Sequence, residues 1–417
     1  MREVGAMTKR LVVLGAGTAG TLLANQLRHR FGTEELQIDI VDRDDVHVYQ
    51  PGLLFVPFGL AKPETLVRPR AGQLKRGIRY HEAEIDRVAL EDRIVHLTDG
   101  STLAYDALVV ATGARLLPEE TEGMLGDAWQ KSVFTFYDLP GATALRDALA
   151  RFEGGRLVVN VVDMPIKCPV APIEFTFLAD AYLRRRGIRE KTTLTYATPL
   201  DSAFTKPVAS KHLTHLLAEK GVELEVEFAA GEVDGDGGRL VSYDGREIPF
   251  DLLVTIPAHG GQAYVERSEG LGDALGFVPT DPATLQARAA ENVFAIGDAT
   301  DLRASKAGSV AHFEGEILAD NIESFVRGEP LTARFDGHAN CFVETGDGKA
   351  LLIDFNDEYE PVPGHFGPLP LLKESRLSHL AKLAFKPVYW HVLLPGHRIP
   401  LVGPTMPLRG KRLEDAA

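Results

Sequence analysis

The spacing of apolar residues along the first part of this 417-residue chain predicts parallel strands joined by a helix. An apolar run at 10–15 reads as a strand, residues 15–30 continue directly as a helix, and residues 36–42 form a second strand. A strand, a helix and a strand within about thirty residues make a βαβ unit, which requires a parallel sheet. A further apolar strand is expected at 106–114, ending in a tight turn.

A second α/β segment follows an irregular crossover at 116–154, where Pro118, Pro140 and Gly141 interrupt regular structure. Its apolar and amphipathic runs predict strands at 156–162, 192–198, 222–228 and 251–257 and helices at 172–187 and 210–221. A last strand and turn at 292–300 and a long helix at 309–328 return to the plan of the first segment. The predicted fold class is α/β.

Composition and charge narrow the range of partners. The chain is 45% hydrophobic, which is enough for a substantial core, and its formal net charge is −14. Nucleic acid is not an expected partner, because phosphate binding needs a basic face. No secretory signal is expected at the start, and the apolar stretch 11–27 is too polar and too broken by glycine to span a membrane.

Three glycines between the first strand and the first helix form the pattern G-x-G-x-x-G. Gly15 permits the turn, Gly17 lets a pyrophosphate approach the backbone, and Gly20 lets helix and strand pack closely. The helix N-terminus then attracts the phosphates. Asp42 ends the next strand, where an acid suits ribose hydroxyls. This arrangement predicts a dinucleotide site.

Two later segments, "VVATGA" (109–114) and "FAIGDAT" (294–300), resemble the further signatures of FAD-dependent two-dinucleotide-binding-domain flavoproteins. The resemblance implies two Rossmann-like domains and an FAD cofactor, with Asp298 near the ribityl–phosphate region. It also adds candidate cofactor contacts at Thr112, Gly113 and Gly297. The implied domains are an FAD-binding domain in two parts (8–150 and 266–330), a second Rossmann-like domain (151–265) and a C-terminal region (331–417).

The second domain lacks the glycine loop that binds NADH in many members of this superfamily. Its equivalent position reads "NVVDMPIKCPVAPIEF" (160–175), with no glycine between Gly155 and Gly187. Asp163 and Glu174 would repel a pyrophosphate, and the prolines remove backbone donors. A flavin that is not reduced by NADH needs another reductant, and a thiol is the candidate.

The chain has two cysteines, Cys168 and Cys341, which could be no more than two unrelated buried thiols. However, "KCPVAPIEF" (167–175) and "ANCFVETGDGKALLIDF" (339–355) resemble the cysteine segments of sulfide:quinone oxidoreductases and related flavocytochrome c sulfide dehydrogenases. The resemblance runs from Lys9 to about Pro400. It implies that the two thiols lie together at the flavin, that sulfide attacks a bridge between them, and that electrons pass through FAD to quinone. A third cysteine found in many members is missing, so non-covalent FAD is expected.

Several residues are expected to support this site. Glu174 follows Cys168 by six residues and is either a base near the flavin or a helix N-terminal charge. The resemblance places Lys306 and Gly308 at the flavin edge. His312 is a possible proton shuttle, although a packed histidine is the commoner case. No metal site is expected.

The last part of the chain carries most of its unbalanced positive charge. Residues 375–395 place leucines at helical spacing until Pro387 breaks the pattern, and an aromatic run follows. A basic, amphipathic, Trp-bearing segment suits a membrane interface, although a helix docked on the core or at a dimer interface is the alternative. We expect peripheral attachment, on the cytoplasmic face, with quinone near Phe342, Tyr389 and Trp390. The basic residues between 365 and 412 are Lys373, Arg376, Lys382, Lys386, Arg398, Arg409, Lys411 and Arg412, against the single acid Glu374.

Three other functions share parts of this pattern. A type II NADH:quinone oxidoreductase would need the missing glycine loop. A non-catalytic redox-sensing protein would hold FAD without using two thiols. A soluble sulfide dehydrogenase paired with cytochrome c would call for a secretory signal. The chain is therefore expected to be an FAD-dependent sulfide:quinone oxidoreductase, with a homo-oligomer possible.

Overall fold

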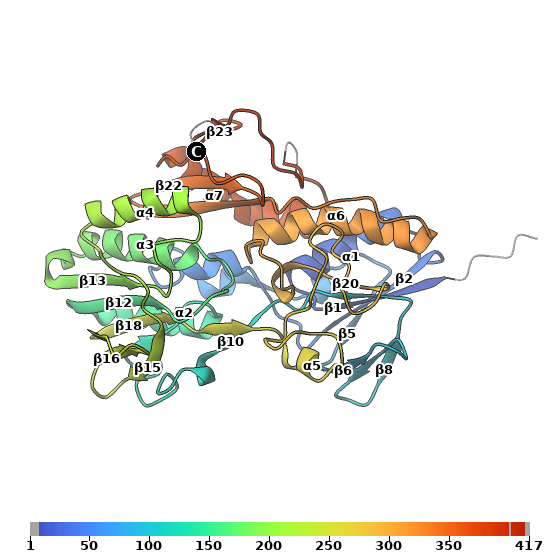
Figure 1. Cartoon of the computed structure of the whole chain (residues 1–417), viewed down its shortest axis with the longest axis horizontal. Coiled ribbons are helices and arrows are strands. Elements are labelled where there is room, and N and C mark those ends of the chain that lie inside the picture. The colour runs from blue at the N-terminus through green and yellow to red at the C-terminus, as the bar shows by residue number, and fades with distance from the viewer. Residues whose placement is uncertain (1–7, 400–401, 413–417) are drawn as a thin grey trace, which may run out of the picture.

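A computed structural model describes residues 8–399 and 402–412 and is built on two five-stranded parallel sheets. The helices α1 (Thr18–Arg30) and α6 (Gly308–Arg327) pack together over the first sheet (Figure 1). The strand order of this sheet is β20 (Val293–Ala295), β9 (Ala107–Val110), β1 (Lys9–Leu14), β2 (Leu36–Asp42) and β5 (Ile78–Glu82). The near-continuous apolar runs of β1 and β9 follow from burial on both faces.

The second sheet is inserted between β9 and β20. Its helices are α2 (Leu139–Arg151), α3 (Ala171–Arg185) and α4 (Pro207–Glu219). The strand order is β11 (Val133–Phe134), β18 (Leu252–Ile256), β12 (Gly155–Val161), β13 (Thr192–Ala197) and β14 (Glu223–Glu225). Because β11 already belongs to this sheet, the chain enters it upstream of residue 151, where the sequence placed the boundary.

The helix α2 was not expected, because residues 116–154 were read as irregular. Asp138 caps this helix by accepting a hydrogen bond from the Gly141 N–H at 2.6 Å. Pro140 lies in the first turn, where its missing N–H costs nothing because that group would have no partner within the helix. The two residues that looked like breakers therefore start a helix.

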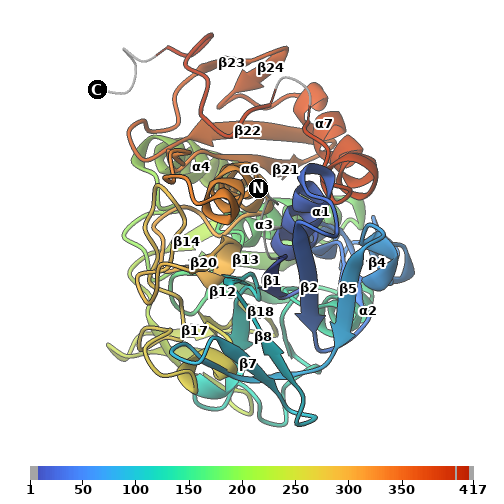
Figure 2. The same ribbon diagram turned by 90° about the vertical axis from the view of Figure 1, so that its right-hand side faces the viewer.

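A C-terminal layer covers the helices. Figures 1 and 2 show this layer above α3 and α6, on the side away from the parallel sheets. Within it, β21 contacts α3 and α6, and α7 packs against β22. Its elements are β21 (Ala339–Gly346), β22 (Lys349–Phe355), β23 (Gly364–Phe366), β24 (Leu369–Leu371), α7 (Arg376–Val388) and a π-helical turn η7 (Tyr389–Leu393).

Pro387 does not end the C-terminal helix as expected. It lies inside α7, and the chain continues as the π-helical turn η7. A wider π turn tolerates the carbonyl that proline leaves without a donor. The expectation of a broken helix is corrected to a bulged one.

Small antiparallel pieces complete the structure. The pair β10 (Arg115–Leu117) and β19 (Ala258–Gly260) carries the chain between the two sheets. Within the described ranges, no helix is both long and apolar enough to cross a bilayer. The remaining elements are β3 (His47–Val48), β4 (Val67–Arg68), β6 (Ile85–Ala89), β7 (Ile94–Leu97), β8 (Thr102–Ala104), β15 (Ala230–Asp234), β16 (Arg239–Ser242), β17 (Glu247–Pro249) and α5 (Ala263–Glu266).

Candidate functional site: a glycine turn beside two thiols

The three glycines of the first motif have different surroundings. Gly15 has a φ of +97°, and a Cβ there would overlap the Ala111 carbonyl. A Cβ on Gly20 would overlap the Gly15 carbonyl oxygen. In contrast, a Cβ on Gly17 would meet no atom within 4 Å. Gly15 and Gly20 are therefore required by packing, whereas Gly17 borders open space beside the N-terminus of α1.

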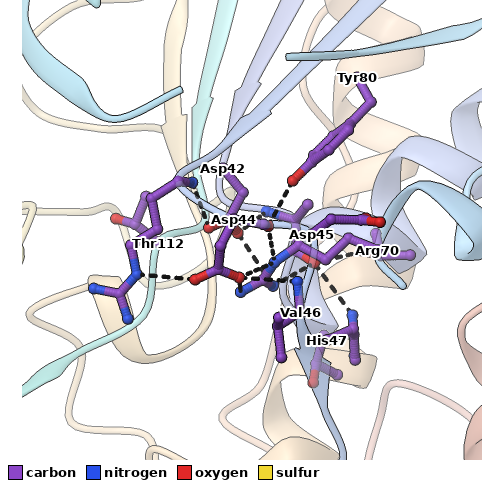
Figure 3. A network of polar contacts seen from close by, with 12 residues as sticks. Asp42, Asp44, Asp45, Val46, His47, Arg70, Tyr80 and Thr112 are labelled. Carbon is purple, nitrogen blue, oxygen red and sulfur yellow. Dashed lines mark hydrogen bonds and ion pairs between the residues drawn. The ribbon is translucent and has the colours of Figure 1, made fainter. Parts of the chain in front are cut away.

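The polar network around Asp42 and Arg70 (Figure 3) holds the backbone of Ala16, in the middle of this turn. The Ala16 N–H donates to Asp42 Oδ2 at 2.8 Å. Its carbonyl accepts from Arg70 Nη1 at 3.0 Å, and Arg70 also pairs with Asp42 at 3.2 Å. Burial raises the pKa of Asp42, and Arg70 opposes this shift. Asp42, expected as a ribose ligand, thus also fixes the turn.

The second and third motifs lie at the same edge of the sheet. Gly297 sits between α1 and α6, where a Cβ would contact the Cβ atoms of Ala19 and Ala311 at 3.5 and 3.7 Å. Gly113 and Gly308, like Gly17, would gain a Cβ without meeting any atom within 4 Å. Glycines of the first two motifs and the first residue of α6 therefore border open space next to two helix N-termini. This donor set fits the phosphates and ring of a dinucleotide.

Three other predicted cofactor contacts lie in the turns around these glycines. Thr112 hydrogen-bonds Tyr264 at 3.1 Å, and Asp298 is half-buried. Burial raises the pKa of Asp298, against the effect of two lysines. Lys306 Nζ donates to the Thr300 carbonyl at 2.6 Å and to the Asp298 carbonyl at 3.2 Å. Lys306 therefore fixes the turn that leads into α6.

The Cys168 backbone is held in a left-handed conformation, with a φ of +51°. Its N–H donates to the Lys306 carbonyl at 2.5 Å, and its carbonyl accepts from Ala171 N at 2.9 Å and Tyr137 Oη at 3.1 Å. Such a conformation is rare outside glycine and persists only where the surroundings impose it. Here the turn before α6 and the start of α3 impose it.

Cys341 reaches the same turn from the C-terminal layer. It lies in β21, and the carbonyl of its neighbour Asn340 accepts a hydrogen bond from Ser309 Oγ at 2.7 Å. Both cysteine segments thus bind residues 306–309, although they are 173 positions apart. The structure contains both residues as free thiols, each half-buried.

The two thiols influence each other electrostatically. Burial, and then the Glu174 carboxylate, raise the pKa of Cys168 to about 12, while Lys382 opposes the shift. Burial also raises the pKa of Cys341, and a negative charge on Cys168 raises it further. The thiols therefore lie within each other's field, and both are held protonated by this environment.

Glu174 is completely enclosed rather than exposed at a helix terminus. Its Oε1 forms an ion pair with Lys382 of α7 and accepts a hydrogen bond from Glu344 N at 2.7 Å. Burial raises the pKa of Glu174 against the effect of Lys382. Lys382 also donates to the Phe342 carbonyl at 3.1 Å. Because Lys382 neutralises Glu174, the expected repulsion of a pyrophosphate falls on Asp163 alone.

Several predicted residues lie apart from the thiols. His312 is buried in α6, burial lowers its pKa to about 4, and neither ring nitrogen has a hydrogen-bond partner. Phe342 follows Cys341 in a strand, so their side chains point to opposite faces. Tyr389 is buried against the first glycine turn, and Trp390 is buried against His47, so neither faces solvent.

The sequence did not identify Lys382, Tyr137, Arg70 or His47 as site residues. Lys382 had one usable signal, a cation within the apolar spacing of a predicted helix. The other three act through contacts with segments distant in sequence, such as the 54 positions between Arg70 and Ala16. No local pattern marks such contacts.

Comparison with known proteins agrees with this geometry. Residues 9–160 match the family model described as pyridine nucleotide-disulphide oxidoreductase. The chain is 28% identical to the mitochondrial sulfide:quinone oxidoreductase of Dictyostelium discoideum, over 95% of this chain and 88% of that protein. It is 25% identical to the mouse (Mus musculus) enzyme of the same name, over 93% and 86% of the two chains.

A solved structure extends the likeness to the fold. The sulfide:quinone oxidoreductase of Aquifex aeolicus superimposes with a TM-score of 0.81 at 19% identity, covering 94% of this chain and 92% of that one. The family model and the three flavin motifs identify FAD as the cofactor. The chain is thus an FAD-binding flavoprotein that is similar to sulfide:quinone oxidoreductases over nearly its whole length.

Proposed function

We propose that this chain oxidises sulfide at Cys168 and Cys341 and passes two electrons through FAD to a membrane quinone. The observation that carries this proposal is the attachment of both cysteine segments to the turn 306–309, at the N-terminus of α6. That turn borders the open space lined by the glycines of the flavin motifs. This attachment supports a role for the thiols as the electron donor to the flavin.

The sulfur chemistry needs an oxidised bridge between the cysteines. Hydrosulfide attacks one sulfur of a Cys168–Cys341 disulfide, forming a persulfide on that cysteine and releasing the other as a thiolate. A second hydrosulfide takes up the outer sulfur of the persulfide and leaves as hydrogen disulfide, which frees both cysteines as thiolates. FAD, when bound, would accept the two electrons released when these thiolates close the bridge again, and quinone would take those electrons from the reduced flavin. Lys382 lowers the pKa of Cys168 and so favours a leaving thiolate, whereas Glu174 opposes it and is placed to take up a proton.

We assign the FAD to the residues that border the open space. Gly15, Gly17 and Gly20 with the N-terminus of α1 would hold the pyrophosphate, and Asp42 the ribose. The other proposed contacts are Thr112, Gly113, Gly297, Asp298, Lys306 and Gly308.

The outer face of α7 supports docking at a membrane surface. Leu377, Leu380 and Leu383 are 47, 59 and 46% exposed and lie on one face of the helix. An exposed leucine stripe on a helix of this kind suits insertion into the headgroup region of a bilayer. We propose this stripe as the contact with the membrane, on its cytoplasmic side, and Phe342 as a quinone contact.

The basic residues of the tail contribute less to this contact than the sequence indicated. Lys382 pairs with Glu174, Lys411 with Asp354, and Arg398 with Glu316 at 3.7 Å. These three cations are therefore already balanced inside the chain, and apolar burial is the larger part of the proposed membrane affinity.

The test is an anaerobic reduction of the bound flavin. Purified holoprotein is mixed with sulfide or, separately, with NADH while the flavin absorbance is followed, and a quinone is then added. We expect bleaching by sulfide alone and recovery on addition of quinone. Bleaching by NADH but not by sulfide would assign a type II NADH:quinone oxidoreductase, and bleaching by neither would assign a non-catalytic flavoprotein.

A further inference from the structure

The aromatic residue Tyr389, far along the chain, lies against the first glycine turn. Its hydroxyl is 2.7 Å from Thr18 Oγ1, the first residue of α1, and 2.7 Å from His47 Nε2. The other ring nitrogen of His47 is 3.2 Å from the Ala16 carbonyl. Tyr389 therefore bridges the end of the turn and its middle residue; we call this set of hydrogen bonds the Tyr389 bridge.

The direction of every hydrogen bond in the bridge follows from the protonation states. Burial and Arg70 lower the pKa of His47 to about 4, so the ring is neutral at physiological pH. A carbonyl only accepts, so the ring proton lies on Nδ1 and Nε2 is an acceptor. Burial raises the pKa of Tyr389, so its hydroxyl is protonated and donates to Nε2. Thr18 then donates to the Tyr389 oxygen.

The carbonyl of Ala16 is the point at which the bridge meets the rest of the network. It accepts hydrogen bonds from His47 Nδ1, Arg70 Nη1 and Thr21 Oγ1. A carbonyl held in this way cannot rotate, which fixes the peptide that joins Ala16 to Gly17, the residue that borders the open space. Preformed donors bind an anion more tightly because no ordering cost remains.

The segment after Tyr389 continues along α1. Asn25 Nδ2 donates to the Leu394 carbonyl at 2.6 Å, and His29 Nε2 is 3.1 Å from the Pro395 carbonyl. Gly396 lies so close to the helix that a Cβ would be 2.7 Å from Gln26 N. The C-terminal segment is thus fixed to the helix whose N-terminus faces the proposed phosphates.

We propose that Tyr389 is a positioning residue for the cofactor: its hydroxyl holds the glycine turn in the conformation that binds the FAD pyrophosphate. This inference rests on the proposed placement of FAD at the turn and not on the sulfide chemistry. It replaces the expectation of Tyr389 as a quinone contact, because the ring is 2% exposed and its hydroxyl is engaged.

The test measures how fast FAD leaves the holoenzyme. Tyr389→Phe removes the hydroxyl and leaves His47 Nε2 buried without a donor. We expect about tenfold faster release of FAD, followed by the rise in fluorescence of the free flavin on dilution. Tyr105→Phe is the matched control, since its buried hydroxyl has no partner, and it should release FAD at the parent rate.

Two further measurements separate positioning from general destabilisation. A positioning role shrinks the increase in Tm that added FAD produces, whereas a purely structural role lowers Tm equally with and without FAD. Thr18→Val breaks the bridge from its other end, and the double variant should release FAD no faster than either single variant. If Tyr389→Phe does not fold, Thr18→Val alone tests the Tyr389 bridge.

Gly17→Ala adds a methyl group to the open space itself. This variant distinguishes failure of the proposed Tyr389 bridge from failure of the proposed FAD placement. Parent-like FAD release in Tyr389→Phe or in Thr18→Val, with fast release in Gly17→Ala, would overturn the bridge and leave the FAD placement intact. Parent-like release in Gly17→Ala as well would overturn the placement of FAD at this turn.

Discussion

Lys382 of α7 forms a buried ion pair with Glu174 of α3, across 208 positions of sequence. Burial acts to lower the pKa of Lys382, but Glu174 and Glu344 overcome it and the net pKa is raised. The same lysine binds the carbonyl after Cys341, so one side chain from the outermost helix joins both cysteine segments.

Replacing one residue of this ion pair should destabilise the protein more than replacing both. Lys382→Met leaves Glu174 buried without a counter-charge, and the expected loss is about 3–5 kcal/mol. The double variant Glu174→Gln with Lys382→Met should recover a large part of this lost stability, and the Tm measures the recovery. Lys386→Met, whose side chain donates to the Thr65 hydroxyl at 2.9 Å and pairs with neither glutamate, is the control. A double variant no more stable than Lys382→Met would contradict the assignment.

The thiols should be indispensable for reduction by sulfide and dispensable for the cofactor. Cys168→Ser and Cys341→Ser each prevent the bridge that sulfide must attack, so each should abolish sulfide-dependent bleaching. FAD content should remain at the parent level, because neither thiol holds the glycine turn. Reduction by dithionite, which bypasses the thiols, is the control for an intact flavin. Sulfide bleaching at the parent rate in either variant would refute a shared redox centre.

Gly17→Ala should separate cofactor binding from folding. The residue has a φ of −79°, which alanine adopts without strain, and the added Cβ meets no atom within 4 Å. Stability without FAD should therefore be unchanged or higher by about 0.4–1 kcal/mol, while FAD binding falls because the methyl group occupies the space of the pyrophosphate. Fluorescence titration and unfolding by urea measure the two quantities. Gly403→Ala, equally unobstructed, should have a similar effect on stability and leave FAD binding unchanged.

Glu314 should make stability depend on pH near neutrality. Burial raises the pKa of this carboxyl from 4.5 to about 8, even though Gly297 N donates to it at 2.6 Å. Because the folded pKa lies above the unfolded one, its contribution is fully present below about pH 4.5 and is lost as pH rises toward 8, at up to about 1.4 kcal/mol per pH unit.

Glu314→Gln mimics the protonated acid and removes this dependence. With saturating FAD, the variant should have a Tm close to the parent at pH 5 and a higher Tm at pH 8.5. If the difference in Tm between the variant and the parent is the same at pH 5 and at pH 8.5, Glu314 does not titrate in this range.

The leucine stripe of α7 should control membrane binding. Leu380→Glu removes apolar area from the proposed contact and adds a charge facing the lipid, so vesicle affinity should fall about tenfold or more. Co-sedimentation with vesicles that contain anionic lipid measures this affinity. Leu275→Glu changes a similarly exposed leucine outside α7 and should leave binding unchanged. Equal losses in both variants would argue against the stripe.

The sequence predicted most of the fold because its signals are local. The strands β1, β2 and β12 and the helices α3 and α6 were placed within two residues, and α1 was expected to begin three residues earlier than it does. Each has an uninterrupted pattern of apolar residues, and most have a glycine or proline at one end. The helix α2 was missed because Pro140 and Gly141 resemble breakers, and only the cap made by Asp138 identifies a start.

The site was predictable only where a motif is continuous. The glycines and cysteines belong to recognisable motifs, so their positions can be predicted from the sequence. Lys382 and Tyr389 contact residues 208 and 371 positions away, and no pattern near them in the sequence indicates those partners. The aromatic pair at 389–390 looked like a membrane anchor because its composition is the same whether it faces lipid or a buried turn.

The Tyr389 bridge also has a consequence for biosynthesis. Thr18 is translated 371 residues before its partner, so the glycine turn leaves the ribosome long before the hydroxyl that fixes it. The turn is therefore completed only when the end of the chain has been made. From the proposed role of Tyr389, we expect chains that stop before this residue to hold FAD less firmly than the full chain does.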